Sequence, residues 1–291
     1  MGTADHQYMH QLGFLLVVCC AAAAAPQPRE RLLQGSYPDF HAAPYHAPVS
    51  QCDVTAVPWS AAGDGVTDDT LALQRCIEKC PRDSTGSFAV VLEEGKRFLT
   101  GSLNLTSGCH LVVDGRLLGS TDPASYPVIP PLAGYGPGQR DNAQNGWGRH
   151  QALLSGWNMS DVVVTGSGVI DGQGLVTDPK LGTSWVTRFH NHKTCESKKN
   201  CRSQPPGSVL DFGRPRVWEP MFSSRVSLVN VSITNQAFWC VHPYGCDDVL
   251  ISNVNISAPR DEGIPNDDGI DPDSTSNVLV EDCWVSVGDN R

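Results

Sequence analysis

Four short segments of the chain resemble one another, and their regular recurrence constrains the fold more than any other feature. Each has a polar residue, then Val, any residue and an aliphatic residue: DVVV at 161–164, RVSL at 225–228, DVLI at 248–251 and NVLV at 277–280. The second and third begin 23 positions apart (225 to 248), and the third and fourth 29 apart (248 to 277). Periods of this size are typical of solenoids, in which each repeat is one coil. The pattern predicts an all-β parallel β-helix.

Alternation within the repeats predicts which side chains fill the core. Three of the segments continue alike, as VNVSI from 229, SNVNI from 252 and EDCWV from 281. Stacked coils are about 4.8 Å apart, and successive side chains of a strand point to opposite faces. The side chains expected inside are Val231, Ile233, Val254 and Ile256. Asn230 and Asn253 fall in register, as an asparagine ladder requires, so we expect Asn230 to be packed between coils and to be a poor glycan acceptor.

An antiparallel sandwich is the alternative, because it also gives short strands separated by turns. Hairpins of that fold favour dipeptides of the Asn-Gly type. Asn145-Gly146 is one, but it lies in a Pro- and Gly-rich stretch at 126–148 and not between two strand-like segments. The scarcity of such turns favours the β-helix.

One short amphipathic helix is predicted near the start of the folded region, over residues 68–80. Its apolar positions recur at helical spacing behind a Thr67-Asp68 start signal; they are Ala72, Leu73, Cys76, Ile77 and Cys80. The acids of GDGVTDDT at 63–70 are interpreted as capping groups, with a catalytic role for Asp68 or Asp69 as the alternative. No convincing helical pattern follows this one.

The N-terminal region predicts export. Residues 12–25 form an unbroken small and apolar run of fourteen residues, shorter than the roughly 20 that span a bilayer, so residues 1–25 are interpreted as a signal peptide. Residues 26–50 are rich in Pro, Ala and His and are read as a linker. Residues 51–291 then form a single domain.

Composition agrees with an exported protein that does not bind nucleic acid. The chain has 31 acidic and 21 basic residues, a formal net charge of −10, which argues against a general nucleic-acid binder. Removing two leader cysteines from the 11 leaves nine, a number typical of an oxidising compartment. Local disulfides are predicted for Cys195–Cys201 and Cys240–Cys246, each closing a short loop. Sequons occur at Asn104, Asn158, Asn230 and Asn255.

The densest acidic constellation suggests glycosidase chemistry. PNDDGIDPD at 265–273 is followed by GDN at 288–290. Asp268 and Asp289 are 21 positions apart, about one coil, so their carboxylates are expected on adjacent strands of one face. Inverting glycosidases hold two carboxyl groups about 6.5–9.5 Å apart with a water between them. A calcium loop fails because it would put Ile264 where an Asp ligand is needed; a solvated acidic turn remains open.

The stretch NDDGIDPDSTSNVLVEDCWVSVGDN resembles the signature of the polygalacturonases, the pectin-cleaving glycoside hydrolases of family 28. In that family an Asn-Thr-Asp-Gly motif precedes a Gly-Asp-Asp motif by one coil. Supporting matches, most similar to the plant-type branch, are GDGVTDDT, YPVIPPLAGYGPG, GVIDGQG, GRPRVWEP and FWCVHP, which occur in the family's order from residue 51 onward. The resemblance implies a right-handed parallel β-helix with a short N-terminal capping helix and no cofactor.

The resemblance also implies residue roles. Asp289 matches the general acid that protonates the glycosidic oxygen, Asp268 matches a carboxylate that activates water, and Asn266 matches a position near the sugar. Asn290 stands where the family has a second Asp, and a carboxamide cannot accept the proton of the water. Asp267 replaces the usual Thr and adds negative charge beside Asp268.

The sequence given stops before the family's Gly-His-Gly and Arg-Ile-Lys motifs, so the β-helix is expected to be incomplete at its C-terminal end. Residues 188–216 hold a basic cluster, read as a solvated loop, with attraction of a polyanion as the alternative. His190 and His192 lack a third ligand for a metal. His242, in FWCVHP, is a candidate sugar contact, with a hydrogen-bonded structural histidine as the alternative.

Together with these observations, the resemblance implies a secreted cell-wall hydrolase of α-1,4-galacturonan, monomeric if complete, that needs no metal or cofactor. It is expected to bind no nucleic acid and to have no membrane association after the leader is removed. Two rivals remain. One is a catalytically silent pectin-binding protein, for which Asn290 and the missing motifs speak. The other is a polysaccharide lyase on the same fold, which needs calcium ligands and a basic residue to abstract a proton.

Overall fold

The structure is a computed structural model of the 291-residue chain. It describes residues 16–18, 48, 50–130, 132, 149–197, 213–259 and 264–288, of which 16–18 and 192–197 are described as backbone only. The predicted signal peptide and linker lie almost wholly outside these residues, as do Asp289 and Asn290. Strand β1 (Leu16–Val18), within the predicted signal peptide, pairs in parallel with β19.

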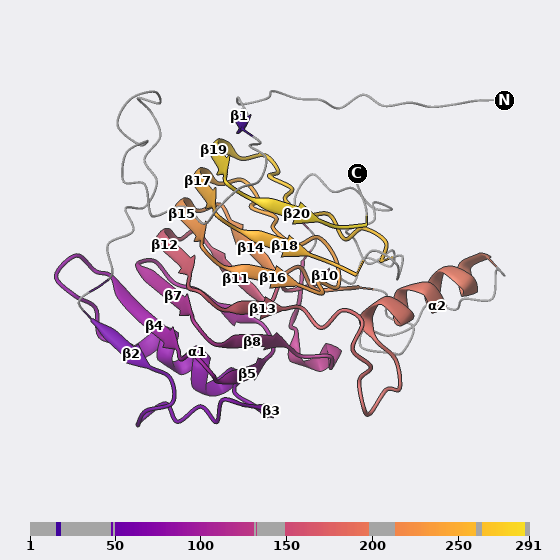
Figure 1. Ribbon diagram of the computed structural model, residues 1–291, viewed down its shortest axis with the longest axis horizontal. Helices are drawn as coiled ribbons and strands as arrows, with labels where there is room; N and C mark the ends of the chain where they lie inside the picture. Colours follow the sequence, from indigo (N-terminus) through magenta and orange to yellow (C-terminus); the bar gives the residue numbers. More distant parts are fainter. Residues whose placement is uncertain are drawn as a thin grey trace.

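Three parallel sheets run along the length of the folded region (Figure 1). Sheet A contains, besides β1, the strands β2 (Gln51–Asp53), β4 (Phe88–Leu92), β7 (Cys109–Val113), β12 (Ser160–Thr165), β15 (Ser224–Val229), β17 (Asp247–Ser252) and β19 (Ser276–Glu281). Sheet B contains β3 (Asp64–Asp68), β5 (Arg97–Thr100), β8 (Arg116–Gly119), β13 (Val169–Asp171), β16 (Ser232–Thr234), β18 (Asn255–Ser257) and β20 (Trp284–Ser286). Sheet C contains β6 (Leu103–Asn104), β11 (Leu154–Trp157) and β14 (Trp218–Met221).

Two further coils extend sheet C through isolated bridges instead of continuous strands. Val241 bridges Trp218 on one side and Ile270 on the other, all in parallel. Tyr244 does the same between Met221 and Asp273. Successive coils therefore visit sheets A, B and C in turn, and the architecture is a parallel β-helix.

The repeat seen in the sequence is the sheet register. Val162, Val226, Val249 and Val278 are direct partners across β12, β15, β17 and β19. The antiparallel pairing within the described residues is confined to β9 (Val128–Ile129) and β10 (Arg149–His150). The β-helix prediction is confirmed, and the antiparallel sandwich is excluded.

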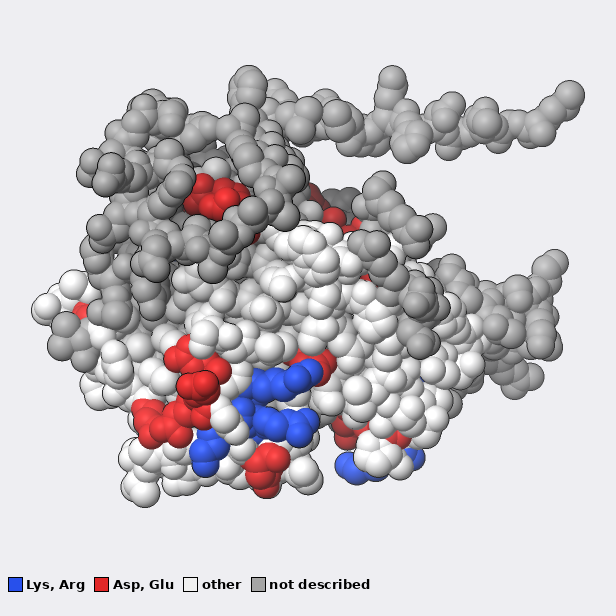
Figure 2. Space-filling view, viewed as in Figure 1, with Lys and Arg blue, Asp and Glu red and all other residues white. Residues whose placement is uncertain are grey.

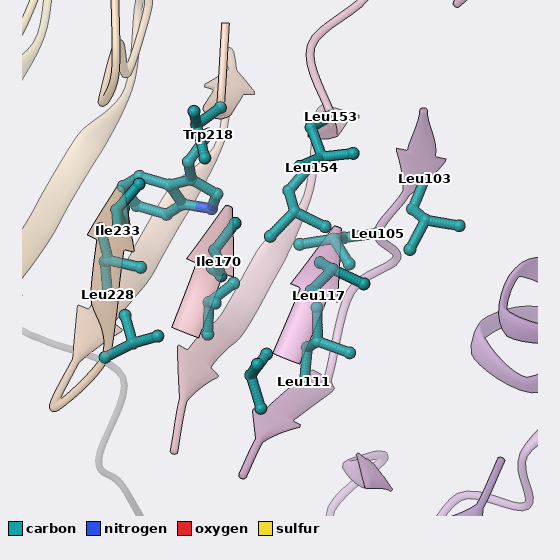
Figure 3. Packing of buried hydrophobic residues seen from close by; sticks show 14 of the residues in the cluster. Leu103, Leu105, Leu111, Leu117, Leu153, Leu154, Ile170, Trp218, Leu228 and Ile233 are labelled. Carbon is teal, nitrogen blue, oxygen red and sulfur yellow. The ribbon is translucent and has the colours of Figure 1, made fainter. Parts of the chain in front are cut away.

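The core lies inside the coils, where the three sheets face one another. The residues predicted to point inward are buried: Val231, Ile233, Val254 and Ile256. Figure 3 shows how side chains from the different sheets meet, with Trp218 of sheet C beside Ile170 and Ile233 of sheet B. Burial of apolar surface contributes about 25 cal/mol of stability per Å². Because similar residues stack on one another in successive coils, each coil covers the edge of its neighbour.

The coils turn at corners where one residue has a positive φ. Between sheets A and B these residues are Asn230, Asn253 and Asp282. Asn tolerates this left-handed region better than most residues. The predicted ladder exists, because Nδ2 of Asn253 donates to Oδ1 of Asn230 at 2.9 Å. Both side chains are exposed at the corner, so the expectation that Asn230 is packed between coils is wrong.

Helix α1 (Thr70–Lys79) lies near the N-terminal coils and confirms the predicted capping helix. It buries Leu73, Cys76 and Ile77 in the core. The acids before it organise backbone: Asp69 accepts hydrogen bonds from the N–H groups of Ala62 and Gly63, and Asp64 accepts from those of Val66 and Thr67. Asp68 accepts from the N–H of Thr70, the first residue of α1, but the capping role predicted for these acids is wrong for the N-cap residue Asp69, whose side chain makes no cap hydrogen bond.

Helix α2 (Trp185–Ser197) was not expected, since the sequence suggested a solvated loop from residue 188. The Oγ of Ser184 accepts from the N–H of Thr187 at 3.1 Å, as an N-cap does. Trp185 and Val186 are buried, whereas the rest of the helix has little apolar periodicity. The Ser184 cap followed by Trp185 was the sequence signal that could have revealed it. A short 3₁₀ turn (Pro123–Ser125) completes the helical elements of the described residues.

The disulfide of the described residues joins Cys52 of β2 to Cys80 at the end of α1. The predicted Cys240–Cys246 bond is wrong, because both are buried free thiols. The chain between them is held to the neighbouring coils at Val241 and Tyr244, which separates the two ends. The Sγ of Cys246 donates instead to the carbonyl of Pro220. The predicted Cys195–Cys201 bond lies outside the described residues.

None of the helices described is both long enough and apolar enough to cross a membrane.

Candidate active site

The acidic segment predicted to carry chemistry lies at the start of the last described coil of sheet C. Asp267 is fully buried and Asp268 is 6% exposed. The backbone carbonyl of Asp268 accepts from the N–H of Cys240 at 2.9 Å, and that of Asp267 accepts from Nε2 of Gln236 at 3.1 Å. Hydrogen bonds from the preceding coil therefore fix the backbone of both residues.

Asp267 also joins this coil to the next one. Its Oδ2 accepts a hydrogen bond of 2.9 Å from the N–H of Gly288. Gly288 is the first residue of the GDN segment, and the contact places Gly288 itself one coil beyond Asp267. A Cβ at position 288 would lie 3.3 Å from both Asp267 carboxylate oxygens, so a glycine suits the close approach. Asp289, the predicted acid, lies outside the described residues.

Arg214 holds the acidic segment from the side. Its guanidinium donates to the carbonyl of Ala237 at 2.9 Å, to that of Pro265 at 2.6 Å and to Oδ1 of Asn266 at 3.4 Å. It thereby links two consecutive coils. Burial lowers the pKa of Arg214 to about 9, against the opposing influence of Asp267 and Asp268. Arg214 is thus a cation at neutral pH, facing the two carboxylates.

Aromatic rings enclose the same guanidinium. It lies 4.1 Å from the ring centroid of Phe189 on α2 and 4.7 Å from that of Phe238. Such cation–π contacts favour a charged group where water is scarce. The basic cluster at 188–216 is therefore partly wrong as a solvated loop: Arg188, Arg214 and Arg216 are at most 5% exposed. Lys198, Lys199 and Arg202 lie outside the described residues, and so does the side chain of Lys193.

A second group of buried charges surrounds Glu219 on β14. Its carboxylate lies 2.6 Å from Nη1 of Arg149, 3.2 Å from Nε of Arg216 and 2.9 Å from Nδ1 of His242. Burial acts to raise the pKa of Glu219, but the charge of Arg216, the His242 hydrogen bond and Arg149 together lower it to about 2. Glu219 is therefore ionised throughout the physiological range.

His242 is the sequence-predicted sugar contact, and it is 1% exposed. Because ionised Glu219 only accepts hydrogen bonds, Nδ1 of His242 carries a hydrogen. Its Nε2 lies 3.9 Å from Oδ2 of Asp273, whose side chain is 30% exposed. The hydrogen-bonded interpretation of this histidine is thereby supported.

Sheet register places several of these groups in one column. Trp218, Val241 and Ile270 are bridged, so the residues that follow them, Glu219, His242 and Asp271, occupy equivalent positions in three consecutive coils. Trp218 and Val241 point into the core, and alternation puts the next residue of each on the outer face of sheet C. The outer face of sheet C therefore carries a polar column formed by Glu219, His242 and Asp271.

Arg149, Arg214 and Glu219 were not singled out from the sequence as site residues. The GRPRVWEP segment contained the available signal, since a charged residue within an apolar strand is rarely buried unless it is paired. Arg149 is 70 positions from Glu219, and no local pattern connects them.

Outside this site, charged residues are mixed. Figure 2 shows that, where the described residues form the surface in this view, Lys and Arg side chains lie beside Asp and Glu side chains. Arg116, for example, is 2.6 Å from Asp171. The described residues also contain no group of three His, Cys, Asp or Glu side chains able to hold a metal ion.

Comparison with known proteins shows which family this chain resembles in sequence. Residues 92–291 match the model of the glycosyl hydrolases of family 28. A probable polygalacturonase of Vitis vinifera is 35% identical over 237 residues, which are 80% of this chain and 42% of that protein. An exopolygalacturonase of Zea mays is 29% identical over 248 residues, 84% of this chain and 48% of that protein. The chain therefore spans less than half the length of these plant relatives.

Solved structures agree on the fold. An exopolygalacturonase of Thermotoga maritima superposes with a TM-score of 0.61 at 25% identity, over 84% of this chain and 54% of that one. A polygalacturonase of Erwinia carotovora gives a TM-score of 0.60 at 23% identity, over 82% and 55%. The predicted right-handed parallel β-helix is confirmed. With its register, its acidic coil and the match over residues 92–291, the chain belongs to glycosyl hydrolase family 28.

Proposed function

We propose that this protein hydrolyses α-1,4-linked galacturonan, the acidic backbone of pectin, by inverting acid/base catalysis. The observation that carries the proposal is the bond from Gly288 N–H to Asp267, which brings Gly288, the residue before Asp289, against the acidic coil. This arrangement suits a pair of carboxyl groups on neighbouring coils. The polygalacturonases among its relatives support pectin as the substrate.

In this proposal Asp268 activates the attacking water and Asp289 protonates the leaving oxygen. The cationic Arg214 beside Asp268 favours the ionised carboxylate that a base requires. Asn266, anchored by Arg214, is proposed to contact the sugar. His242 is proposed to contribute to the same subsite, through Asp273 at the surface. No step in this scheme uses a metal or cofactor.

The protein is proposed to act outside the cell as a monomer, at the cell wall. A disulfide between Cys52 and Cys80 supports an oxidising compartment. Mass spectrometry of the mature N-terminus tests this: retention of Met1 on the exported protein would exclude cleavage of the leader.

Hydrolysis is tested by reducing-end release from polygalacturonate with product analysis. Saturated products of inverted anomeric configuration are expected, whereas unsaturated products would identify a lyase. Asp268→Asn and Asp289→Asn should each lower kcat by about 10²–10⁴-fold, the usual loss when general acid–base catalysis is removed. Asp271→Asn tests this assignment: a greater loss of kcat there than in Asp289→Asn would mean that the acid is Asp271 and not Asp289.

A catalytically silent pectin binder is the second candidate, favoured by Asn290, which cannot accept the proton of water. Retention on immobilised polygalacturonate without turnover would identify it. Asn290→Asp should then restore measurable hydrolysis if the missing carboxylate is the cause.

A further inference from the structure

Two aromatic side chains lie side by side on the surface at the end of sheet C. Trp157, the last residue of β11, is 64% exposed, and Phe222, directly after β14, is 41% exposed. Their ring centroids are 4.5 Å apart. Two large apolar rings with this degree of exposure on neighbouring coils form a surface patch, and exposed apolar patches often mark binding sites.

The backbone around Phe222 is adapted to present this ring. Phe222 has φ of 49°, at the corner where the other coils use Asn158, Gly245 and Ser274. A bulky residue in this region is an outlier, and such outliers collect at functional sites. A Cβ on Gly245 would approach the Phe222 ring to 2.9 Å, so the glycine leaves room for it.

Ring contacts connect this patch with the candidate active site. Phe222 lies 5.4 Å from Tyr244, which is 6.2 Å from His242. His242 is 5.0 Å from Trp239, which is stacked on Phe238 at 5.0 Å. Phe238 lies beneath the guanidinium of Arg214. An unbroken aromatic strip therefore runs across the coils from Trp157 to the group that holds the acidic segment.

We propose that Trp157 and Phe222 form a distal sugar-binding subsite, where a uronic-acid residue of the pectic chain stacks while a bond further along the chain lies at Asp268. A galacto-configured ring presents the C–H groups of C3, C4 and C5 on one face, which is complementary to the electron-rich face of an aromatic ring. Its carboxylate stays in water at the edge. This inference rests on the proposed pectic substrate.

The local charge does not oppose such a ligand. Just beyond the same corner, Arg225 and Asp161 form two hydrogen bonds of 2.7 Å with each other. This pair is neutral as a unit, so an anionic chain meets no net repulsion from it. Stacking, and not charge, is therefore the expected source of affinity here.

The variants are chosen to remove the rings without disturbing the fold. Trp157→Ala removes one ring, and Phe222→Gly removes the other with a residue that adopts the positive φ without strain and creates no glycosylation sequon. Trp284→Ala is the matched control, because Trp284 on β20 is 56% exposed on sheet B, away from the strip. Thermal unfolding of all three verifies that they are folded.

Binding is measured by titrating oligogalacturonates of increasing length into the Asp268→Asn protein and its double variants. We expect Trp157→Ala and Phe222→Gly each to weaken binding of long oligomers roughly 2- to 10-fold, with little effect on short oligomers and none from Trp284→Ala. In protein with turnover, KM for the polymer should rise while kcat is unchanged. Because binding is measured in the Asp268→Asn protein, the result does not depend on turnover. The subsite could therefore be confirmed even if the proposed hydrolysis were disproved.

Three outcomes would overturn the subsite: equal affinity of all variants for long oligomers, a glycan on Asn158 whose removal by Asn158→Gln creates the binding, or a dimer that Trp157→Ala dissociates. The first removes the ligand, the second assigns the rings to the protein's own glycan, and the third assigns them to a second copy of the chain.

Discussion

The carboxylate of Asp267 accepts a hydrogen bond of 2.9 Å from the backbone N–H of Gly288, 21 residues further along the chain. One side chain thus fixes the approach of two coils at the point where the proposed acid and base must meet. Asp267 differs from the threonine that the family resemblance leads one to expect, and its structural role explains how a buried carboxylate is tolerated there: it is paired with a donor and faces Arg214.

This relationship predicts that Asp267→Ala is destabilising while Asp267→Thr is tolerated. Alanine leaves the Gly288 N–H without its acceptor, which costs about 1–3 kcal/mol of unfolding free energy, whereas threonine keeps an oxygen. Urea unfolding of the two variants measures the difference. Because both variants lack the carboxylate charge, equal destabilisation by the two would mean that charge and not the acceptor is what matters at this position.

A second prediction concerns Arg214, which is buried together with the carboxylates it faces. Arg214→Met removes three hydrogen bonds and the positive charge beside Asp268, so hydrolysis should fall by more than the change in stability explains. Removing one partner of a buried ionic group typically costs about 3–5 kcal/mol. Initial rates at a temperature where every variant is folded separate the two effects.

The matched control is Arg188→Met. Arg188 is equally buried, stacks on Trp185 at 4.2 Å and donates to the carbonyls of Thr183 and Thr121. It should lose stability but keep its rate. Equal loss of rate in both variants would show that Arg214 acts only through folding.

Sequence reasoning succeeded where the signal was periodic and local. The Val-containing repeats fixed the register of sheet A, because a one-residue slip would turn Val226 or Val249 outward. It failed where partners are distant or the pattern is weak. Glu219 finds Arg149 70 residues away, and α2 is set by a cap at Ser184 and by tertiary contacts rather than by an apolar face. The predicted ladder of Asn230 and Asn253 exists, but Asn230 is exposed and not packed between coils, because the corner with positive φ turns its side chain to the surface.

A third prediction follows from the thiols. Burial raises the pKa of Cys76 and of Cys109 to about 12 and that of Cys246 to about 11. Thiolate is the reactive form, so these groups should resist alkylation in the native protein and react after unfolding. Mass spectrometry after native and denaturing alkylation checks this, and peptide mapping should recover Cys52–Cys80 as a disulfide. A mapped Cys240–Cys246 bond would contradict the arrangement of this coil.

The last prediction is the pH dependence of stability that Glu219 imposes. Its pKa is lowered from the ordinary 4.5 to about 2, so the folded state binds this proton less readily than the unfolded state does. The stabilisation is therefore complete above pH 4.5 and is lost as the pH falls toward 2. A shift of this size corresponds to on the order of 3 kcal/mol.

Glu219→Gln removes that titration but leaves Arg149 and Arg216 without their anion, so the variant should be less stable than the parent at pH 7 by about 3–5 kcal/mol. Between pH 4.5 and 2 the two proteins should converge, because the parent loses the ionised carboxylate that the variant already lacks. Urea unfolding across this range, with Arg116→Gln at the partly exposed Arg116–Asp171 pair as control, measures the convergence. The control should lose at most about 1 kcal/mol, as expected for an ion pair in contact with water. A difference between parent and Glu219→Gln that stayed constant from pH 7 to pH 2 would mean that the carboxylate is not what holds Arg149, Arg216 and His242 together.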